Sequence, residues 1–367
     1  MASPGEVRVA VARGDDLLDY AIWRPGAPDG VGDLHRGRII ARVPALAGSF
    51  VTLEGEPDGF LPDSEGGARL TEGMLAGVRI SRAAQGGKGP RLTARLTEED
   101  QRLAGSGPVR RIRRGPGAVE RLAACYPEAP VLADDAGLAA TLREKLGPRI
   151  SVAQDLPGEA LAGRIAALHL PEVPLPSGGR LSIHPTPALV AIDMDTGSAS
   201  AARAGKSAAQ LAANRAMLPA LAREIRLRNL SGAIVVDFAG LSPRRRAQLG
   251  PALAAALADD PLHPRLLGFT ALGLAEIVRT RIHPPLHELL AGPHAAGLEA
   301  LRQLAHEISA RPARPPALRV TPAIAAALDA DPLARAELAH RAGRPLMLRT
   351  DPALPAPGWL IEDDAHG

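Results

Sequence analysis

Two apolar runs that each end in an aspartate, with one long amphipathic stretch between them, constrain the fold of this chain more than any other feature. The first run is Ala188–Asp193 and the second is Gly232–Asp237, and residues 207–228 have the apolar spacing of a helix. A strand, a long helix and a second strand form a right-handed crossover unit. The pattern therefore predicts a parallel or mixed sheet.

Further elements are expected on both sides of this unit. A helix at 241–258 should begin with Ser242 as its cap and Pro243 in its first position. An Ala/Arg/Pro-rich stretch at 293–316 should lead to a small terminal unit. The other expected elements are a hairpin of 7–12 and 17–23, a helix at 136–146, a strand at 150–152, a strand at 266–270 and a helix at 272–281.

Short β-type runs separated by glycines fill residues 32–96 and predict a small barrel of the OB type. Phe50 and Phe60 fall at strand ends of this barrel, and Lys88 lies in a glycine-rich loop. Exposed aromatic rings on such a barrel stack unpaired bases, and nearby cations hold the nucleic-acid backbone. The alternative is that either phenylalanine belongs to the core. The five runs are 35–43, 48–53, 59–62, 74–80 and 91–96.

The composition, with 46% hydrophobic and 23% charged residues among 367, is that of a globular protein of two or three domains. The single Cys125 excludes an internal disulfide and a multi-cysteine zinc fold, and we expect it to be a small buried side chain. The sequence has neither a signal-peptide pattern in its first residues nor a long apolar run. We expect a soluble cytoplasmic protein with no membrane contact.

The 43 basic residues barely exceed the 40 acidic ones, so net charge does not establish a polyanionic partner. All but three of the basic residues are arginines, an excess that a GC-rich genome explains better than phosphate binding does. Within the basic, glycine-rich stretch 102–117, four arginines cluster at positions 110, 111, 113 and 114. The default interpretation of that stretch is a solvated linker, and the alternative is contact with RNA or phosphate.

Asp193 and Asp237 should meet at one edge of the predicted sheet, because each ends one of two neighbouring strands. This edge, at the carboxyl ends of the strands, is where open α/β sheets bind ligands. Carboxylates that converge, here with Asp195 nearby, favour a bound Mg²⁺. Each aspartate could instead cap the following turn or helix. A phosphate-binding loop at Gly205–Ser207 is disfavoured because Ser200 stands where that motif needs glycine.

Four ordered blocks of the chain resemble the ribonuclease E/G family. The resemblance implies an α+β and α/β multidomain fold, in which an OB-fold RNA-binding barrel is inserted in an RNase H-like subdomain. A DNase I-like mixed-sheet catalytic subdomain and a small C-terminal α/β unit follow. The blocks are residues 32–62, residues 175–197 with Leu-Pro-Ser-Gly-Gly-Arg and Ala-Ile-Asp-Met-Asp-Thr-Gly, residues 222–238, and residues 268–281.

The expected domain boundaries follow from the same resemblance. They are residues 1–30 for strands that join the RNase H-like subdomain, 31–97 for the barrel, 98–117 for a basic linker in place of the family's sensor region, 118–174 for the RNase H-like subdomain, 175–292 for the DNase I-like subdomain and 293–367 for the small domain.

In function, the resemblance implies an endoribonuclease that cuts single-stranded RNA with Mg²⁺ and leaves 5′-phosphate ends. Asp193 and Asp237 match the family's metal-binding aspartates, and Asp195, where the family commonly has Asn, is expected to contribute to the metal site. Phe50 and Phe60 match base-stacking phenylalanines, with Lys88 as their cationic partner. The remaining expected RNA contacts are Arg279 and Arg281.

The chain also departs from the family. Residues 282–292 hold no cysteine for the family's zinc link, so no zinc is expected and a homodimer would form without it. Most of the sensor for RNA 5′ ends is missing, and Ala212 and Ala216 replace polar residues around Asn214. These losses motivate an alternative: an RNA-binding homologue that has lost catalysis.

Overall fold

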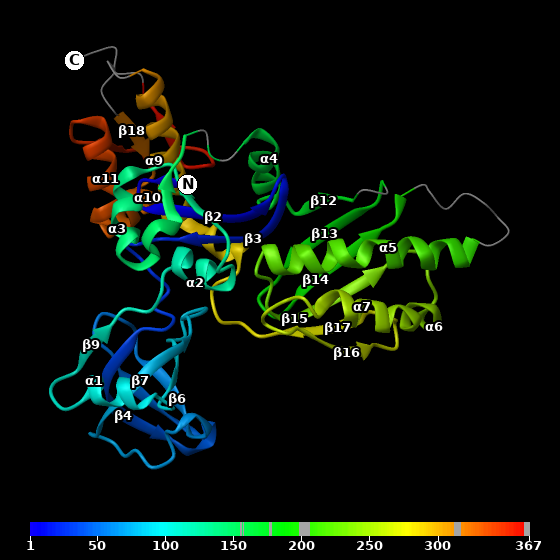
Figure 1. Ribbon diagram of the computed structural model, residues 1–367, viewed down its shortest axis with the longest axis horizontal. Helices are drawn as coiled ribbons and strands as arrows, with labels where there is room; N and C mark the ends of the chain where they lie inside the picture. The colour runs from blue at the N-terminus through cyan, green and yellow to red at the C-terminus, as the bar shows by residue number, and fades with distance from the viewer. Residues whose placement is uncertain (155, 157, 176–177, 198–205, 312–316, 363–367) are drawn as a thin grey trace. The chain divides into compact units, whose positions relative to one another are not determined.

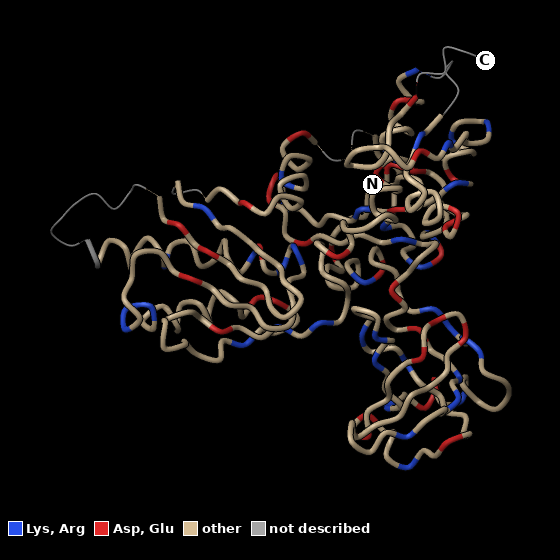
Figure 2. The backbone as a smooth tube through the Cα atoms, turned by 180° about the vertical axis from the view of Figure 1, so that it is seen from behind, with Lys and Arg blue, Asp and Glu red and all other residues tan. Residues whose placement is uncertain are grey.

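The computed structural model describes residues 1–154, 156, 158–175, 178–197, 206–311 and 317–362 (Figure 1). Ser200 and Gly205, on which the phosphate-loop alternative depends, lie outside these residues. The chain divides into two compact units. One unit comprises Met1–Gly26, Tyr126–Arg281 and Pro285–Gly367, and the other comprises Ala27–Cys125 and Ile282–Pro284. Basic and acidic positions are interspersed throughout both units (Figure 2).

The unit of residues 27–125 contains a closed five-stranded barrel, as predicted. Its strands pair in the order β4, β5, β6, β8, β7, and β7 pairs with β4 again to close the ring. Alternate side chains point inward, so Ile39, Val51 and Leu61 are fully buried. The strands are β4 Leu34–Val43, β5 Gly48–Thr52, β6 Gly59–Pro62, β7 Leu75–Arg82 and β8 Arg91–Thr93.

The prediction of a solvated linker at 102–117 is wrong. Helix α1 (Glu98–Ala104) ends there and strand β9 (Arg110–Arg113) pairs with β4. The buried Asp100 carboxylate accepts a hydrogen bond from Arg113 at 2.5 Å, and Arg114 pairs with Asp33 at 2.8 Å. Half of the clustered arginines therefore have carboxylate partners, which hold this segment on the barrel. Helix α2 (Ala118–Cys125) follows and leaves Cys125 exposed, against the prediction of burial.

The other unit contains a six-stranded mixed sheet in the order β12, β13, β14, β15, β17, β16. Strands β14 and β15 are parallel and helix α5 (Lys206–Leu227) connects them, which confirms the predicted crossover unit. The strands are β12 Glu172–Pro174, β13 Arg180–Pro185, β14 Val190–Asp195, β15 Gly232–Phe238, β16 Arg265–Phe269 and β17 Ala275–Arg279.

Among the described residues, helices cover one face of this sheet and leave the other uncovered. Alternate strand residues such as Ile192, Val236 and Phe238 form one apolar core with residues of α5 and α7. The helix predicted for 241–258 is interrupted: α6 spans Pro243–Arg246, a 3₁₀ turn follows, and α7 spans Gly250–Leu257. Pro251 lacks an N–H and starts the new helix near its first position, where no bond is lost.

The helix predicted for 272–281 is wrong, because β17 occupies 275–279 and forms a hairpin with β16. Ala275 and Ile277 are buried while Glu276 between them is exposed, which is the period of a strand. A short apolar run fits both periods, and pairing with β15 decides between them.

The ends of the chain add smaller layers to this unit. The sequence pattern assigned no element to the Ala/Arg/Pro-rich stretch at 293–316, and most of it is the helix α9. The predicted hairpin, helix 136–146 and strand 150–152 are all present. The remaining helices and strands of this unit, predicted or not, are β1 Ala2–Ser3, β2 Glu6–Arg13, β3 Asp16–Trp23, β10 Val131–Ala133, α3 Ala136–Leu146, β11 Ile150–Val152, α4 Glu159–Ala167, α8 Leu286–Leu289, α9 Gly292–Ala310, β18 Ala317–Val320, α10 Pro322–Asp329, α11 Pro332–Ala342, β19 Met347–Thr350 and β20 Trp359–Ile361. Among the described helices, none is long and apolar enough to cross a membrane.

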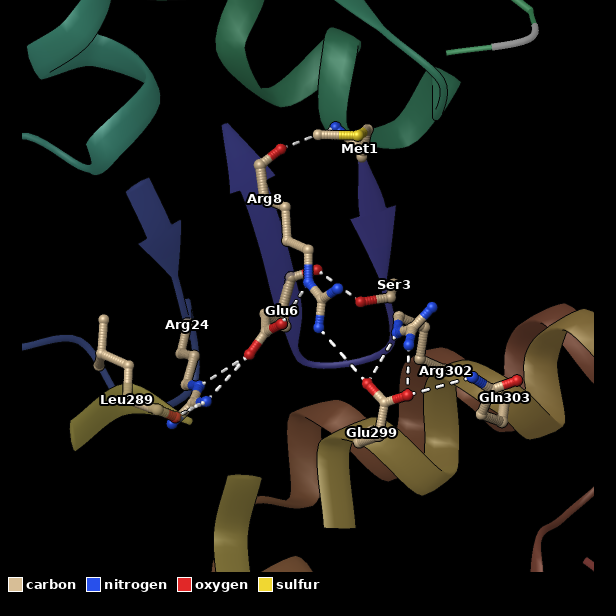
Figure 3. Close-up of polar contacts among 9 residues, drawn as sticks. All are labelled: Met1, Ser3, Glu6, Arg8, Arg24, Leu289, Glu299, Arg302 and Gln303. Carbon is tan, nitrogen blue, oxygen red and sulfur yellow. Dashed lines mark hydrogen bonds and ion pairs between the residues drawn. The ribbon is translucent and has the colours of Figure 1, made fainter. Parts of the chain in front are cut away.

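A buried polar cluster joins the N-terminal hairpin to its surroundings (Figure 3). Glu6, 4% exposed, accepts hydrogen bonds from Arg8 at 2.9 Å and from Arg24 at 3.0 and 3.1 Å. Arg24 also donates to the Leu289 carbonyl, and Arg8 reaches Glu299 of α9 at 3.5 Å. One carboxylate thus pairs with two arginines that are themselves mostly buried.

The phenol of Tyr20, on β3, is buried near this cluster, and its burial should make the stability of the fold depend on pH. Burial raises the pKa of the Tyr20 phenol to about 12, and its hydroxyl has no hydrogen-bond partner among the described residues. A raised pKa stabilises the fold below the unfolded value near 10 and loses that contribution as pH rises toward 12. Urea titrations should therefore show wild-type stability falling relative to Tyr20→Phe between about pH 10 and 12. The stability difference between the two proteins at pH 7 is the reference for this comparison, and parallel losses of stability at high pH would contradict the account.

Candidate active site

The uncovered face of the six-stranded sheet carries the predicted carboxylates. Strand alternation puts Asp193 and Asp195 on the face opposite the buried Ile192 and Met194. Asp193 and Asp237 are direct partners across the parallel pair β14 and β15, so their side chains leave the same face of adjacent strands. The sheet thus brings together the two aspartates that the sequence pattern singled out.

The three aspartates have different partners. Asp193 is exposed and makes no ion pair or hydrogen bond with any described residue. Asp195 accepts the Gly197 N–H at 2.9 Å and lies 4.0 Å from the guanidinium of Arg180. Asp237 is 48% exposed and forms an ion pair with Arg246 of α6 at 2.5 Å. Among the described residues, Asp193 is therefore the aspartate of this face whose oxygens are all available to a ligand. Its neighbours Asp195 and Asp237 both have arginine partners.

Polar side chains of α5 fix the strand ends from the covered face. Gln210 donates to the Thr196 hydroxyl at 2.5 Å and to the Ala239 carbonyl at 3.1 Å. Asn214 is fully buried and donates to the same Ala239 carbonyl at 3.1 Å. Both segments that follow β14 and β15 are thereby tied to one helix, which sets the separation of the aspartates. Sequence reasoning found Asn214 but missed Gln210, whose role depends on where the helix lies.

The carboxylates of the open face limit the kind of metal site that the protein can form. Among the described residues, no group of three or more His, Cys, Asp or Glu side chains is arranged to hold a metal. Mg²⁺ in phosphate-transfer sites keeps several waters and takes only one or two protein carboxylates, with the remaining ligands from substrate. Asp193 and Asp237 supply two carboxylates on one open face, so the residues present fit a hydrated Mg²⁺ and do not fit an all-protein cage.

Two further polar residues lie on the open face, although the sequence favoured structural roles for both. Glu276 of β17 lies opposite Val235 and is exposed, and His184 of β13 lies opposite Ala191 and is exposed. Both sit one row from the aspartate pair. The sequence placed Glu276 on a helix, whereas strand β17 puts its side chain on the face of Asp237.

Arg279 and Arg281 do not lie on this face. Arg279 is 4% exposed and donates to Asp260 at 2.7 Å and to the Asn229 side chain at 2.7 Å. Arg281 forms a two-pronged pair with Glu288, with both contacts at 2.7 Å. Both guanidinium groups are committed to protein acceptors, which favours a structural role over phosphate binding.

The barrel, described by itself, brings its two predicted aromatic residues together. Phe50 and Phe60 are cross-strand partners with ring centroids 5.6 Å apart in an edge-to-face arrangement. Both rings are half-buried, whereas Val51 and Leu61 beside them fill the core. The aromatic pair is therefore on the outer surface of the barrel, where bases can reach it.

Cations flank this aromatic pair. Arg91 is the strand partner of Phe60 and is exposed, and Arg82 is in turn the partner of Arg91. Lys88 is exposed in the turn at 85–88, and Pro90 beyond that turn accepts the Phe60 N–H at 2.8 Å. The strand pairing thus aligns the positions of the two phenylalanines and the two arginines across four neighbouring strands. Arg91 was missed because the pairing of β6 with β8 joins segments that are distant in sequence.

Comparison with known proteins identifies the segment that carries the sheet. Residues 158–282 match the model of the ribonuclease E/G family. The chain is 37% identical to ribonuclease E of Nostoc over 131 residues, which is 35% of this chain and 19% of that protein. It is 34% identical to ribonuclease G of Escherichia coli over 120 residues, or 32% and 24% of the two chains. A longer match to ribonuclease E of Escherichia coli covers 77% of this chain and 36% of that protein at 26% identity. The chain thus matches about a fifth to about a third of the length of these relatives.

Proposed function

Because residues 158–282 match the ribonuclease E/G family, we propose that the chain is an endoribonuclease of this family that cuts single-stranded RNA in RNA processing or decay. The observation that supports this most is the in-register pair Asp193 and Asp237 on the open face of the sheet. The proposal also includes Mg²⁺ dependence, hydrolysis to 5′-phosphate ends, and action in the cytoplasm.

In this proposal Asp193 and Asp237 hold the Mg²⁺. When bound, the ion polarises the scissile phosphate and lowers the pKa of a bound water. Asp193, which has no partner among the described residues, is the principal ligand, and Asp237 supplies the second carboxylate. Asp195 holds the turn at Gly197 and adds negative charge beside the ion. Gln210 and Asn214 keep the two strand ends in position.

The barrel would bind the RNA strand through Phe50, Phe60 and Arg91. Lys88, in the turn that precedes β8, would add a further positive charge. Base stacking on aromatic rings tolerates any sequence, and guanidinium groups neutralise phosphates. Binding of this kind suits an enzyme that acts on unpaired RNA.

Replacing the barrel phenylalanines should weaken RNA binding. Stacking contributes about 1–3 kcal/mol per base, so Phe50→Ala or Phe60→Ala should raise the Kd for an A/U-rich single-stranded RNA by about 5- to 150-fold. Fluorescence anisotropy in EDTA measures the binding without cleavage. Leu46→Ala is the matched control, because Leu46 is an exposed apolar residue of the same barrel. Unchanged affinity in both phenylalanine variants would remove the barrel from the proposal.

The proposed reaction has a direct test. Purified protein is bound to a labelled single-stranded RNA in EDTA, and excess Mg²⁺ is then added. The proposal predicts internal cleavage that begins only after Mg²⁺ is added. Persistent binding without products would favour the alternative of a catalytically inactive RNA-binding homologue, for which the alanines at positions 212 and 216 are the motivation.

The finer architecture belongs to the same proposal. We assign residues 175–292 to a DNase I-like catalytic subdomain, residues 118–174 with the N-terminal strands to an RNase H-like subdomain, and residues 293–367 to a small C-terminal domain. A homodimer, if one forms, would use no zinc link.

A further inference from the structure

Arg246 occupies a position beside the proposed metal site that the sequence did not suggest. Its Nη1 atom lies 2.5 Å from Oδ1 of Asp237, and its side chain is 14% exposed. The Nε atom donates to the Leu241 carbonyl at 2.9 Å. A guanidinium group held by a carbonyl at one nitrogen and by a carboxylate at another has little freedom to leave.

The turn at Gly273 confines the stem of the same side chain. Gly273 has a positive φ of 84°, and a Cβ added there would lie 2.8 Å from Cδ of Arg246. The absence of a side chain at this position therefore makes room for the arginine. Arg244 of the same short helix is exposed and makes no ion pair with any described residue, so the pairing is specific to Arg246.

The charge of this pair bears directly on cation binding. An arginine stays protonated at all accessible pH values, so Arg246 is a permanent cation at Asp237. A metal ion that uses Asp237 must share or displace that partner, whereas no described residue competes in this way at Asp193. Removing the competitor should strengthen metal binding even though no ligand has been added.

We propose that Arg246 is a resident counter-cation of Asp237 that lowers the affinity of the RNA-free protein for its divalent metal. The inference rests on the proposed metal site and deepens it. It makes metal affinity depend on a residue of α6 that is not itself a ligand. Asp237 is then neutralised by protein in the absence of metal.

The test measures Mn²⁺ binding by the loss of the free-ion EPR signal, with no RNA present. Arg246→Gln should bind Mn²⁺ about fivefold more tightly than wild type, the effect expected for removing one partly exposed ion pair. Arg244→Gln removes an equal charge from the same helix and should change the Kd by less than about twofold, because exposed charges are screened. Arg246→Lys keeps the cation and should stay close to wild type.

Each outcome separates the inference from the proposed function. Equal affinities of wild type and Arg246→Gln, or weaker binding in Arg246→Gln, would overturn the inference while leaving the metal site in place. If wild type and Asp193→Asn both fail to bind Mn²⁺, the proposed metal site fails and the inference fails with it. Circular dichroism melting of each variant shows whether it is folded.

Discussion

Asp193→Asn and Asp237→Asn should each reduce RNA cleavage by about 10³-fold or more while leaving the fold intact. Each substitution removes a carboxylate from a two-carboxylate site, and the Lewis-acid effect of a bound ion contributes several kcal/mol, with about 1.4 kcal/mol for each factor of ten. Both side chains lie on the uncovered face of the sheet, so neither substitution disturbs the apolar core. Single-turnover rates on a labelled single-stranded RNA measure the loss.

The matched control for these variants is Asp259→Asn. Asp259 is an exposed aspartate of the same unit, beyond the end of α7, so the substitution makes the same change of charge away from the open face. It should cleave at the wild-type rate. Full cleavage by Asp193→Asn together with Asp237→Asn would refute the assignment of the site.

Glu6→Ala should destabilise the unit that contains the sheet by about 3–5 kcal/mol, the cost of leaving buried charges without their partner. Glu6 is 4% exposed and pairs with Arg8 and Arg24, which are 14% and 10% exposed. Its removal would leave two mostly buried arginines with less compensation than either has now. Arg8 would keep only the longer contact to Glu299, at 3.5 Å.

Urea unfolding of the purified protein measures this loss of stability. Glu128→Ala is the control, because Glu128 is an exposed glutamate of the same unit. Surface substitutions of that kind usually change stability by less than about 0.5 kcal/mol. A Glu6→Ala variant as stable as Glu128→Ala would show that the cluster in Figure 3 contributes nothing net to the fold.

The sequence predicted the paired aspartates because their signal is local. Each one follows an apolar run, and the helix between the runs requires parallel strands, so Asp193 and Asp237 had to end up on one edge. The barrel was predictable for a similar reason, since short β-type runs between glycines admit few other folds. The edge-to-face pair of Phe50 and Phe60 then follows from adjacent strands.

The features that the sequence did not reveal depend on contacts between distant segments. The segment 272–281 has apolar spacing that fits helix and strand alike, and only its pairing with β15 puts Glu276 on the open face and Arg279 on the covered one. The Arg246 pair with Asp237 requires α6 to pack beside β15, and no motif encodes that packing. The same reason explains why Arg91 of the barrel was missed.

The most direct test of the account is the chemistry of the ends that the protein makes. A single-stranded RNA labelled at its 3′ end is incubated with the protein in Mg²⁺ and, separately, in EDTA, and the new 5′ ends are ligated to an adaptor without prior phosphorylation. The account predicts internal fragments that ligate directly and appear only with Mg²⁺. Fragments that form equally in EDTA, or that ligate only after phosphorylation, would contradict it.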